Sequence, residues 1–172
     1  GNVIDLQRIA EIGNRGVLLL LCESTNIERK GSSMSESTVG ASFDNIFADN
    51  PERRIIIATF ASNIHRLQQI LDLAVKYKRK VAFCGRSMVN IAAAASKIGE
   101  LRYNDDVVVD IDKIKNIDDK NLVIISTGSQ GEPMSALTRM ASDELSKVRL
   151  GYNDTVILSA SPIPGNERMV YN

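Results

Sequence analysis

The sequence has few of the residues that metal-dependent or disulfide-stabilised proteins use. Its 172 residues include no tryptophan, one histidine (His65) and two cysteines, Cys22 and Cys84. A catalytic zinc site usually takes several histidine ligands, and no HxH, HExxH or paired-cysteine motif is present. We therefore expect no catalytic transition-metal site in this chain alone. The cysteines have no CxxC spacing and are expected to be buried thiols in a reducing compartment.

Charge and hydropathy exclude further classes of protein. Lys and Arg (21) balance Asp and Glu (21), so the net charge gives no support to a protein that binds nucleic acid through bulk charge. No apolar run is long enough to span a membrane and no signal peptide is recognisable, which favours a cytoplasmic protein without a membrane partner. The chain begins at Gly1 and ends at Asn172 just after a helix signal, so we expect a fragment of a longer protein.

Short apolar runs alternate with amphipathic segments along the chain. The runs predict strands at residues 17–21, 54–59, 81–84, 107–109, 122–125 and 155–159. Helical periodicity between them starts with residues 3–12, where Leu6, Ile9 and Ala10 should form a buried stripe. The alternation predicts an α/β fold: an open, mostly parallel sheet of about five or six strands with helices on both faces, a Rossmann-like three-layer sandwich.

Residues 122–140 carry the clearest local signal. An apolar strand leads into a loop of small residues (126–131, Ser-Thr-Gly-Ser-Gln-Gly), and Pro133 suits the first position of a helix. Met134, Leu137 and Met140 would share the buried face of that helix. A helix N-terminus beside such a loop can bind an anion, whereas the alternative is a tight turn that binds nothing. This segment alone does not decide between them.

Five predicted strands end in loops rich in Ser, Thr, Asn and Gly. In a parallel sheet these loops share one edge, where such folds bind ligands. Hydroxyl and amide groups there, with Arg86 as the cation, suit a phosphate-bearing or sugar-bearing chain. Helix caps favour the same residues, but capping explains one or two such loops more readily than five. Neither a P-loop nor a GxGxxG or GxSxG motif is present.

Taken together, five motifs closely resemble the β-CASP domain of bacterial ribonuclease J, in the expected order and at similar spacing. They are Glu-Ser-Thr-Asn at 23–26, Thr-Phe-Ala-Ser-Asn-Ile-His-Arg at 59–66, Phe-Cys-Gly-Arg-Ser-Met at 83–88, Ser-Thr-Gly-Ser-Gln-Gly-Glu-Pro-Met at 126–134 and Ser-Pro-Ile-Pro-Gly-Asn-Glu at 161–167. The resemblance implies that residues 1–16 are a linking helix from an absent catalytic domain and that residues 17–172 form the β-CASP domain.

Enzymes of this family are metal-dependent ribonucleases that act on RNA from the 5′ end and internally. The resemblance therefore implies an RNA-clamping domain, with zinc or manganese held by an absent metallo-β-lactamase domain and no cofactor or nuclease activity in this chain alone. It implies three partners: single-stranded RNA, that catalytic domain of the same chain, and further copies of the parent protein.

Two groups of residues follow from this resemblance and from the loops. Glu23 stands where ribonuclease J usually has Asp, and is implied to be an accessory catalytic acid that faces the absent domain. The residues expected to contact RNA phosphates and sugars are Ser62, Asn63, His65, Arg86, Ser87, Gly128, Ser129 and Ser161.

Two other functions remain open at this point. The chain could be a free-standing α/β domain that binds a small phosphorylated ligand at the same edge. It could also be a structural module for docking or dimerisation.

Overall fold

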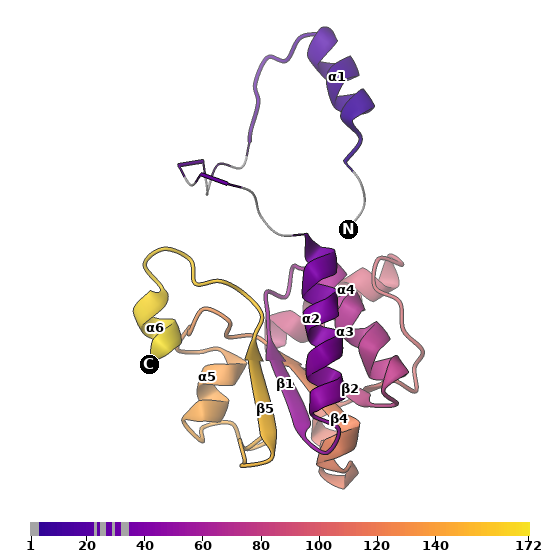
Figure 1. The fold of residues 1–172 in the computed structure, drawn as a ribbon, viewed down its shortest axis with the longest axis vertical. Helices are drawn as coiled ribbons and strands as arrows, with labels where there is room; N and C mark the ends of the chain where they lie inside the picture. Colours follow the sequence, from indigo (N-terminus) through magenta and orange to yellow (C-terminus); the bar gives the residue numbers. More distant parts are fainter. Residues whose placement is uncertain (1–3, 23, 25–26, 29, 32–34) are drawn as a thin grey trace. The chain divides into compact units, whose positions relative to one another are not determined.

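Five parallel strands form the centre of the fold in the computed structural model, which describes residues 4–22, 24, 27–28, 30–31 and 35–172 (Figure 1). The chain packs as two units, Gly1–Thr38 and Val39–Asn172, and the sheet belongs to the second. The strand order is β3-β2-β4-β1-β5. The strands are β1 (Arg54–Ala58), β2 (Lys80–Cys84), β3 (Val108–Val109), β4 (Leu122–Ser126) and β5 (Asp154–Leu158).

Helices cover both faces of this sheet. The α-helices are α1 (Leu6–Asn14), α2 (Glu36–Asp49), α3 (Ile64–Lys76), α4 (Arg86–Lys97), α5 (Ala136–Ala141) and α6 (Glu167–Tyr171), and the 3₁₀ turns are η1 (Ile111–Asn116) and η2 (Asp119–Asn121). Ile55 and Ile57 point to the face that α2, α3 and α4 cover, whereas Ile56 points to the face that α5 and η1 cover. Both faces are apolar because both are buried, which explains the uninterrupted aliphatic runs.

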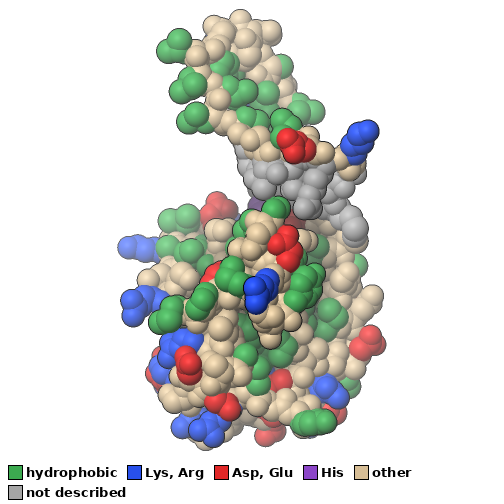
Figure 2. Space-filling model, turned by 90° about the vertical axis from the view of Figure 1, so that its left-hand side faces the viewer, with side chains coloured by type: hydrophobic (Ala, Val, Ile, Leu, Met, Phe, Trp, Pro, Cys, Tyr) green, Lys and Arg blue, Asp and Glu red, His purple; other side chains and the backbone are tan. Residues whose placement is uncertain are grey.

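The predicted fold class is confirmed, since the sheet is open and all its strand pairs are parallel. The outer strand β5 is only half covered, with Val156 43% and Leu158 44% exposed. Figure 2 views the larger unit from the side that carries α6, where apolar and charged side chains are interspersed. Among the described residues, no helix is both long enough and apolar enough to cross a membrane.

The prediction of a buried strand at residues 17–21 is wrong. These residues are not part of the sheet, and Leu18, Leu19, Leu20 and Leu21 are each at least 72% exposed. An aliphatic run predicts that a segment needs burial, but it does not specify the edge that would pair with it. No such edge receives this run within the part of the chain that the structure describes.

The first helix forms, but its bounds and the burial of its apolar face differ from the prediction. It forms at Leu6–Asn14 instead of residues 3–12, and Asp5 caps it by accepting a hydrogen bond from the Arg8 N–H. Leu6 is 68% and Ile9 52% exposed, and Ala10 is exposed as well, so the predicted buried stripe is wrong. The helical period was therefore correct, but it carries no information on what covers the apolar face.

An ion pair joins the amino ends of β1 and its neighbour, the edge strand β5. The Arg54 guanidinium donates to both carboxylate oxygens of Asp154, at 2.7 and 2.6 Å, and also to the Arg149 carbonyl at 2.7 Å. The side chains are only 13% and 3% exposed. Hydrogen bonding to Asp154 raises the pKa of Arg54.

We expect Asp154→Ala to lower the free energy of unfolding by about 2–3 kcal/mol, because a largely buried guanidinium loses its two carboxylate hydrogen bonds and keeps only the half-exposed Asp119 carboxylate at 3.7 Å. Urea titration followed by circular dichroism measures this change. The matched control is Asp112→Ala, which removes the partner of Lys147 from an exposed pair and should shift the midpoint little. Equal midpoint shifts for the two variants would contradict the expectation.

Candidate functional site

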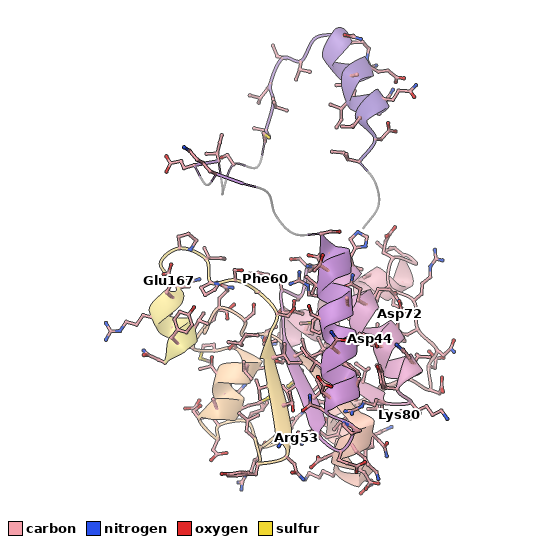
Figure 3. The ribbon with its side chains drawn as sticks, viewed as in Figure 1. Asp44, Arg53, Phe60, Asp72, Lys80 and Glu167 are labelled. Atoms are coloured by element: carbon pink, nitrogen blue, oxygen red, sulfur yellow. The ribbon has the colours of Figure 1, made fainter. Side chains whose placement is uncertain are left out.

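The loops that follow four strands begin side by side at one edge of the sheet. Beyond the strand ends, the Thr127 N–H donates to the Cys84 carbonyl (3.3 Å), Thr59 to Ser126 (3.1 Å) and Ser159 to Ala58 (2.8 Å). We call these loops, residues 59–63, 85–87, 127–135 and 159–166, the rim. Figure 3 labels Phe60 at this edge and Arg53 and Lys80 at the opposite one. Four of the five loops that were predicted to gather at this edge are therefore present there. The fifth, residues 23–26, lies largely outside the described residues, and the run 17–21 before it is not a strand of the sheet.

The largest cavity of the rim lies between the loops after β2 and β4. The chain leaves β2 for α4 on one face of the sheet, and leaves β4 for α5 on the other. Such divergence opens a crevice at the carboxyl ends of parallel strands. The cavity has a volume of about 570 Å³, and its polar lining is Arg86, Ser87, Thr127, Glu132, Ser135 and Arg139.

The composition of this cavity suits an anionic group. Two guanidinium groups, from Arg86 and Arg139, line it together with the first turn of α4. Gly85, the N-cap of this 12-residue helix, provides no side-chain cap, so the first-turn N–H groups and the positive end of the helix dipole are available to a ligand. Ser87 and Thr127 add hydroxyl groups, whereas the Ser135 hydroxyl is engaged with Thr138. Glu132 is the single carboxylate.

Close contact between the two loops depends on Gly85. Its φ is +107°, and a Cβ atom there would lie 2.7 Å from Thr127 Oγ1. That oxygen accepts a hydrogen bond from the Ala136 N–H at 3.1 Å, which ties the start of α5 to the loop. Glycine at this position therefore lets α4 begin directly against Thr127.

The prediction that Pro133 opens the helix after β4 is wrong. The helix α5 begins at Ala136, because Ser135 is its N-cap and accepts a hydrogen bond from the Thr138 N–H at 3.3 Å. Pro133 and Met134 lie in the preceding turn, and Met134 is 84% exposed instead of buried. Since α5 has only six residues, the helix N-terminus that serves the cavity is that of α4.

The predicted contact residues are spread over several parts of the rim. Arg86 and Ser87 line the cavity between the loops after β2 and β4, which we call the main cavity. Ser161 lines a hollow of about 360 Å³ next to α2, together with Arg66, and Gly128 lines one of about 380 Å³ next to α6. Ser129 is only 1% exposed, so its hydroxyl is not offered at the surface.

The remaining three predicted residues lie at the start of α3. Ser62 and His65 are exposed there. Asn63 is the N-cap, and its Oδ1 accepts a hydrogen bond from the Arg66 N–H at 3.2 Å. Capping therefore already accounts for Asn63, as the alternative interpretation of these loops expects.

Sequence reasoning missed four polar residues of the cavity. Thr127 and Ser135 lie within residues 122–140, the segment with the clearest local signal in the sequence. They could have been found there, since hydroxyl residues in such loops cap helices or bind ligands. Glu132 was also within that segment. Arg139 has no comparable sequence signal, because its position depends on where α5 begins.

Two further predictions concern acids and thiols. Glu23 lies outside the described residues. Cys22 is exposed, so the prediction that both thiols are buried is correct only for Cys84. Within the described ranges, no group of three or more His, Cys, Asp or Glu side chains is arranged to hold a metal ion.

Comparisons with known proteins agree on one family. Residues 52–172 match the family model described as the β-CASP domain of ribonuclease J. The chain is 44% identical to ribonuclease J of Synechocystis sp. over 172 residues, which is 100% of this chain and 27% of that protein. It is 43% identical to the Helicobacter pylori (strain 26695) enzyme over 166 residues (96% and 24%), and 42% identical to the Thermus thermophilus enzyme over 170 residues (99% and 29%). The chain thus spans about a quarter of the length of these relatives.

Cys84 at the cavity wall should be a slow nucleophile. Burial raises its pKa to about 11, so at pH 8 only about one thiol in a thousand is ionised. In a Cys22→Ser variant, we expect iodoacetamide to alkylate the folded protein slowly at pH 8, with a rate that rises about tenfold per pH unit up to pH 10. Mass spectrometry measures the rate, with the urea-unfolded variant as the control. Alkylation at pH 8 as fast as in the unfolded chain would contradict this.

Proposed function

Because the chain belongs to the β-CASP domain family of ribonuclease J, we propose that it is the RNA-contacting domain of a metal-dependent ribonuclease. In this proposal the rim binds the sugar-phosphate backbone of single-stranded RNA. The observation that carries the proposal is the main cavity, where Arg86, Arg139 and the N-terminus of α4 converge with the hydroxyl groups of Ser87 and Thr127. Guanidinium groups and helix N-termini are the usual partners of phosphate oxygens in proteins.

The chemistry of the rim supports backbone contact more than base reading. Hydroxyl groups and backbone N–H groups bind phosphate and ribose without reporting the base. The net charge of the chain is zero, so attraction to RNA is local to the cavity. The isolated chain should therefore bind RNA weakly and without sequence preference.

Cleavage belongs to the rest of the parent protein in this proposal. The relatives extend well beyond the matched region, which leaves room for a metallo-β-lactamase domain that would hold zinc or manganese. RNA would lie between that domain and the rim, and 5′-to-3′ exonuclease and endonuclease activities would be those of the intact protein. Glu23 would serve as an accessory acid toward the catalytic domain. Assembly of several parent copies and a cytoplasmic location also remain predictions.

A small phosphorylated ligand is the second candidate for the cavity, because one phosphate group would satisfy the same donors. Family membership favours RNA over this alternative and over a purely structural module. Competition separates the first two: a mononucleotide should displace RNA only at concentrations far above those of an oligonucleotide, since it satisfies fewer sites.

Arg86→Ala should weaken binding of a single-stranded oligouridylate and reduce the slope of log Kd against log salt concentration by about one, because one phosphate contact is lost. Fluorescence anisotropy over a salt series, in the full-length protein that carries this domain, measures both quantities. Lys97→Ala is the matched control, since Lys97 is an exposed cation at the opposite end of the same helix. An unchanged slope for Arg86→Ala would remove Arg86 from the interface.

The 172-residue chain by itself should contain no stoichiometric zinc or manganese and should cleave no RNA, because a divalent site needs three or four convergent ligands. Elemental analysis of the purified chain and a nuclease assay with either metal added test this. The positive control is the full-length protein in the same buffers. About one tightly bound ion per chain, together with activity that persists through repurification, would contradict the assignment of catalysis to another domain.

A further inference from the structure

We propose that Gln130 is a positioning residue that holds two loops of the rim together as one RNA-contacting surface. The loops are the segment after β4, which borders the main cavity, and residues 161–166 after β5. This inference rests on the proposed RNA-binding function, and it assigns a role to a side chain that is itself only 2% exposed and cannot meet RNA directly.

The Gln130 carboxamide uses both its donor and its acceptor across the gap between the loops. Its Nε2 donates to the Ser161 carbonyl at 3.1 Å, and its Oε1 accepts from the Ile163 N–H at 2.7 Å and from the Asn166 side-chain amide at 3.4 Å. Three contacts from one carboxamide therefore reach residues more than thirty positions away in the sequence. A buried amide that is paired at both its nitrogen and its oxygen fixes the relative position of the segments it joins.

The backbone around Gln130 is fixed as well. Its N–H donates to Glu132 Oε2 at 3.2 Å, so the loop turns back on itself at this position. The next residue, Gly131, has a φ of +70°, and a Cβ atom there would overlap the backbone carbonyl of Met169 in α6. The loop after β4 therefore lies directly against the segment after β5, and the carboxamide joins two surfaces already in contact.

The position of Gln130 argues against a role only in the core. Its side-chain hydrogen-bond partners are backbone and polar groups of the loop after β5, and none of them belongs to the sheet. Ser161, whose carbonyl it holds, is one of the predicted RNA contacts. Loss of the carboxamide should therefore loosen residues 161–166 while the sheet stays folded.

Gln130→Met tests this inference, because methionine keeps the length and removes every hydrogen bond of the side chain. The first readout is amide hydrogen exchange of Ile163, measured by NMR, which we expect to rise at least about tenfold when its acceptor is lost. The second is the Kd for a single-stranded oligouridylate, which we expect to rise about three- to tenfold because the rim loops must be ordered on binding. Circular dichroism confirms that each variant is folded.

The matched control is Gln68→Met. Gln68 also bridges two segments through its carboxamide, donating to the Arg102 carbonyl and accepting from the Arg102 N–H, both within 2.8 Å. It lies on the second turn of α3, and its partner Arg102 belongs to none of the rim loops. Its replacement should accelerate exchange of the Arg102 amide and leave the RNA Kd unchanged.

A second variant separates the two ends of the carboxamide. Gln130→Glu retains an acceptor for the Ile163 N–H but cannot donate to the Ser161 carbonyl. Ile163 should then stay protected from exchange, unlike in Gln130→Met. Equal acceleration in both variants would instead assign the hold on this loop to the Nε2 contact with the Ser161 carbonyl, which Gln130→Glu also removes.

The remaining outcomes also decide the question. Unchanged exchange of Ile163 in Gln130→Met would overturn the inference outright. Faster exchange with an unchanged RNA Kd would reduce Gln130 to a local structural role. If the unmodified chain and the full-length protein bound no RNA, the proposed function would fail, but the exchange result would still report whether Gln130 joins the loops.

Discussion

In-register parallel pairing of β2, β4, β1 and β5 is the constraint on which the rest of this structure depends. The last residue of β4, Ser126, is aligned with Cys84 of β2 and with Ala58 of β1, and Ala58 is aligned with Leu158 of β5. The four connecting loops therefore leave the sheet at the same level. Burial of both faces maintains that register, because a slip by one residue would turn every side chain to the opposite face. The rim is therefore a consequence of core packing. Core packing sets where its loops begin, and side chains such as Gln130 then join the loops to one another.

The same constraint explains which parts of the structure could be predicted from sequence. Residues 122–125 read as a strand buried on both faces, and they form the fully buried β4. Residues 17–21 have the same pattern and are exposed. The difference between them is the presence of neighbouring strands, which composition does not record. Apolar runs therefore predicted five strands and the fold class, whereas only the structure shows which strands pair with one another.

The candidate site was predictable at the level of loops but not at the level of individual contacts. Arg86 and Ser87 follow a strand directly, so the position of the strand places them at the cavity. Ser129 and Gln130 sit in an equally polar segment, yet both are buried, because the loop folds inward where Gly131 lies against α6. Competition between Pro133 and Ser135 for the start of α5 was decided by a cap hydrogen bond. Such local choices of a few kcal/mol or less are not visible in residue type alone.

Two arginines of this neutral chain show that one cation can stabilise the fold while another stays available to a ligand. Arg79 is 4% exposed, and its guanidinium donates to the carbonyls of Arg53 and Asn50 at 2.7 and 2.6 Å, while burial lowers its pKa. Both of its terminal nitrogens donate to backbone carbonyls of the fold, so this buried guanidinium adds nothing to a surface that meets a ligand. Arg86 is exposed at a cavity whose only carboxylate is Glu132. The number of basic residues therefore says little about anion binding. A guanidinium group can bind an anion only if its N–H groups are accessible at the surface. On this basis a chain of zero net charge can still offer a local phosphate site.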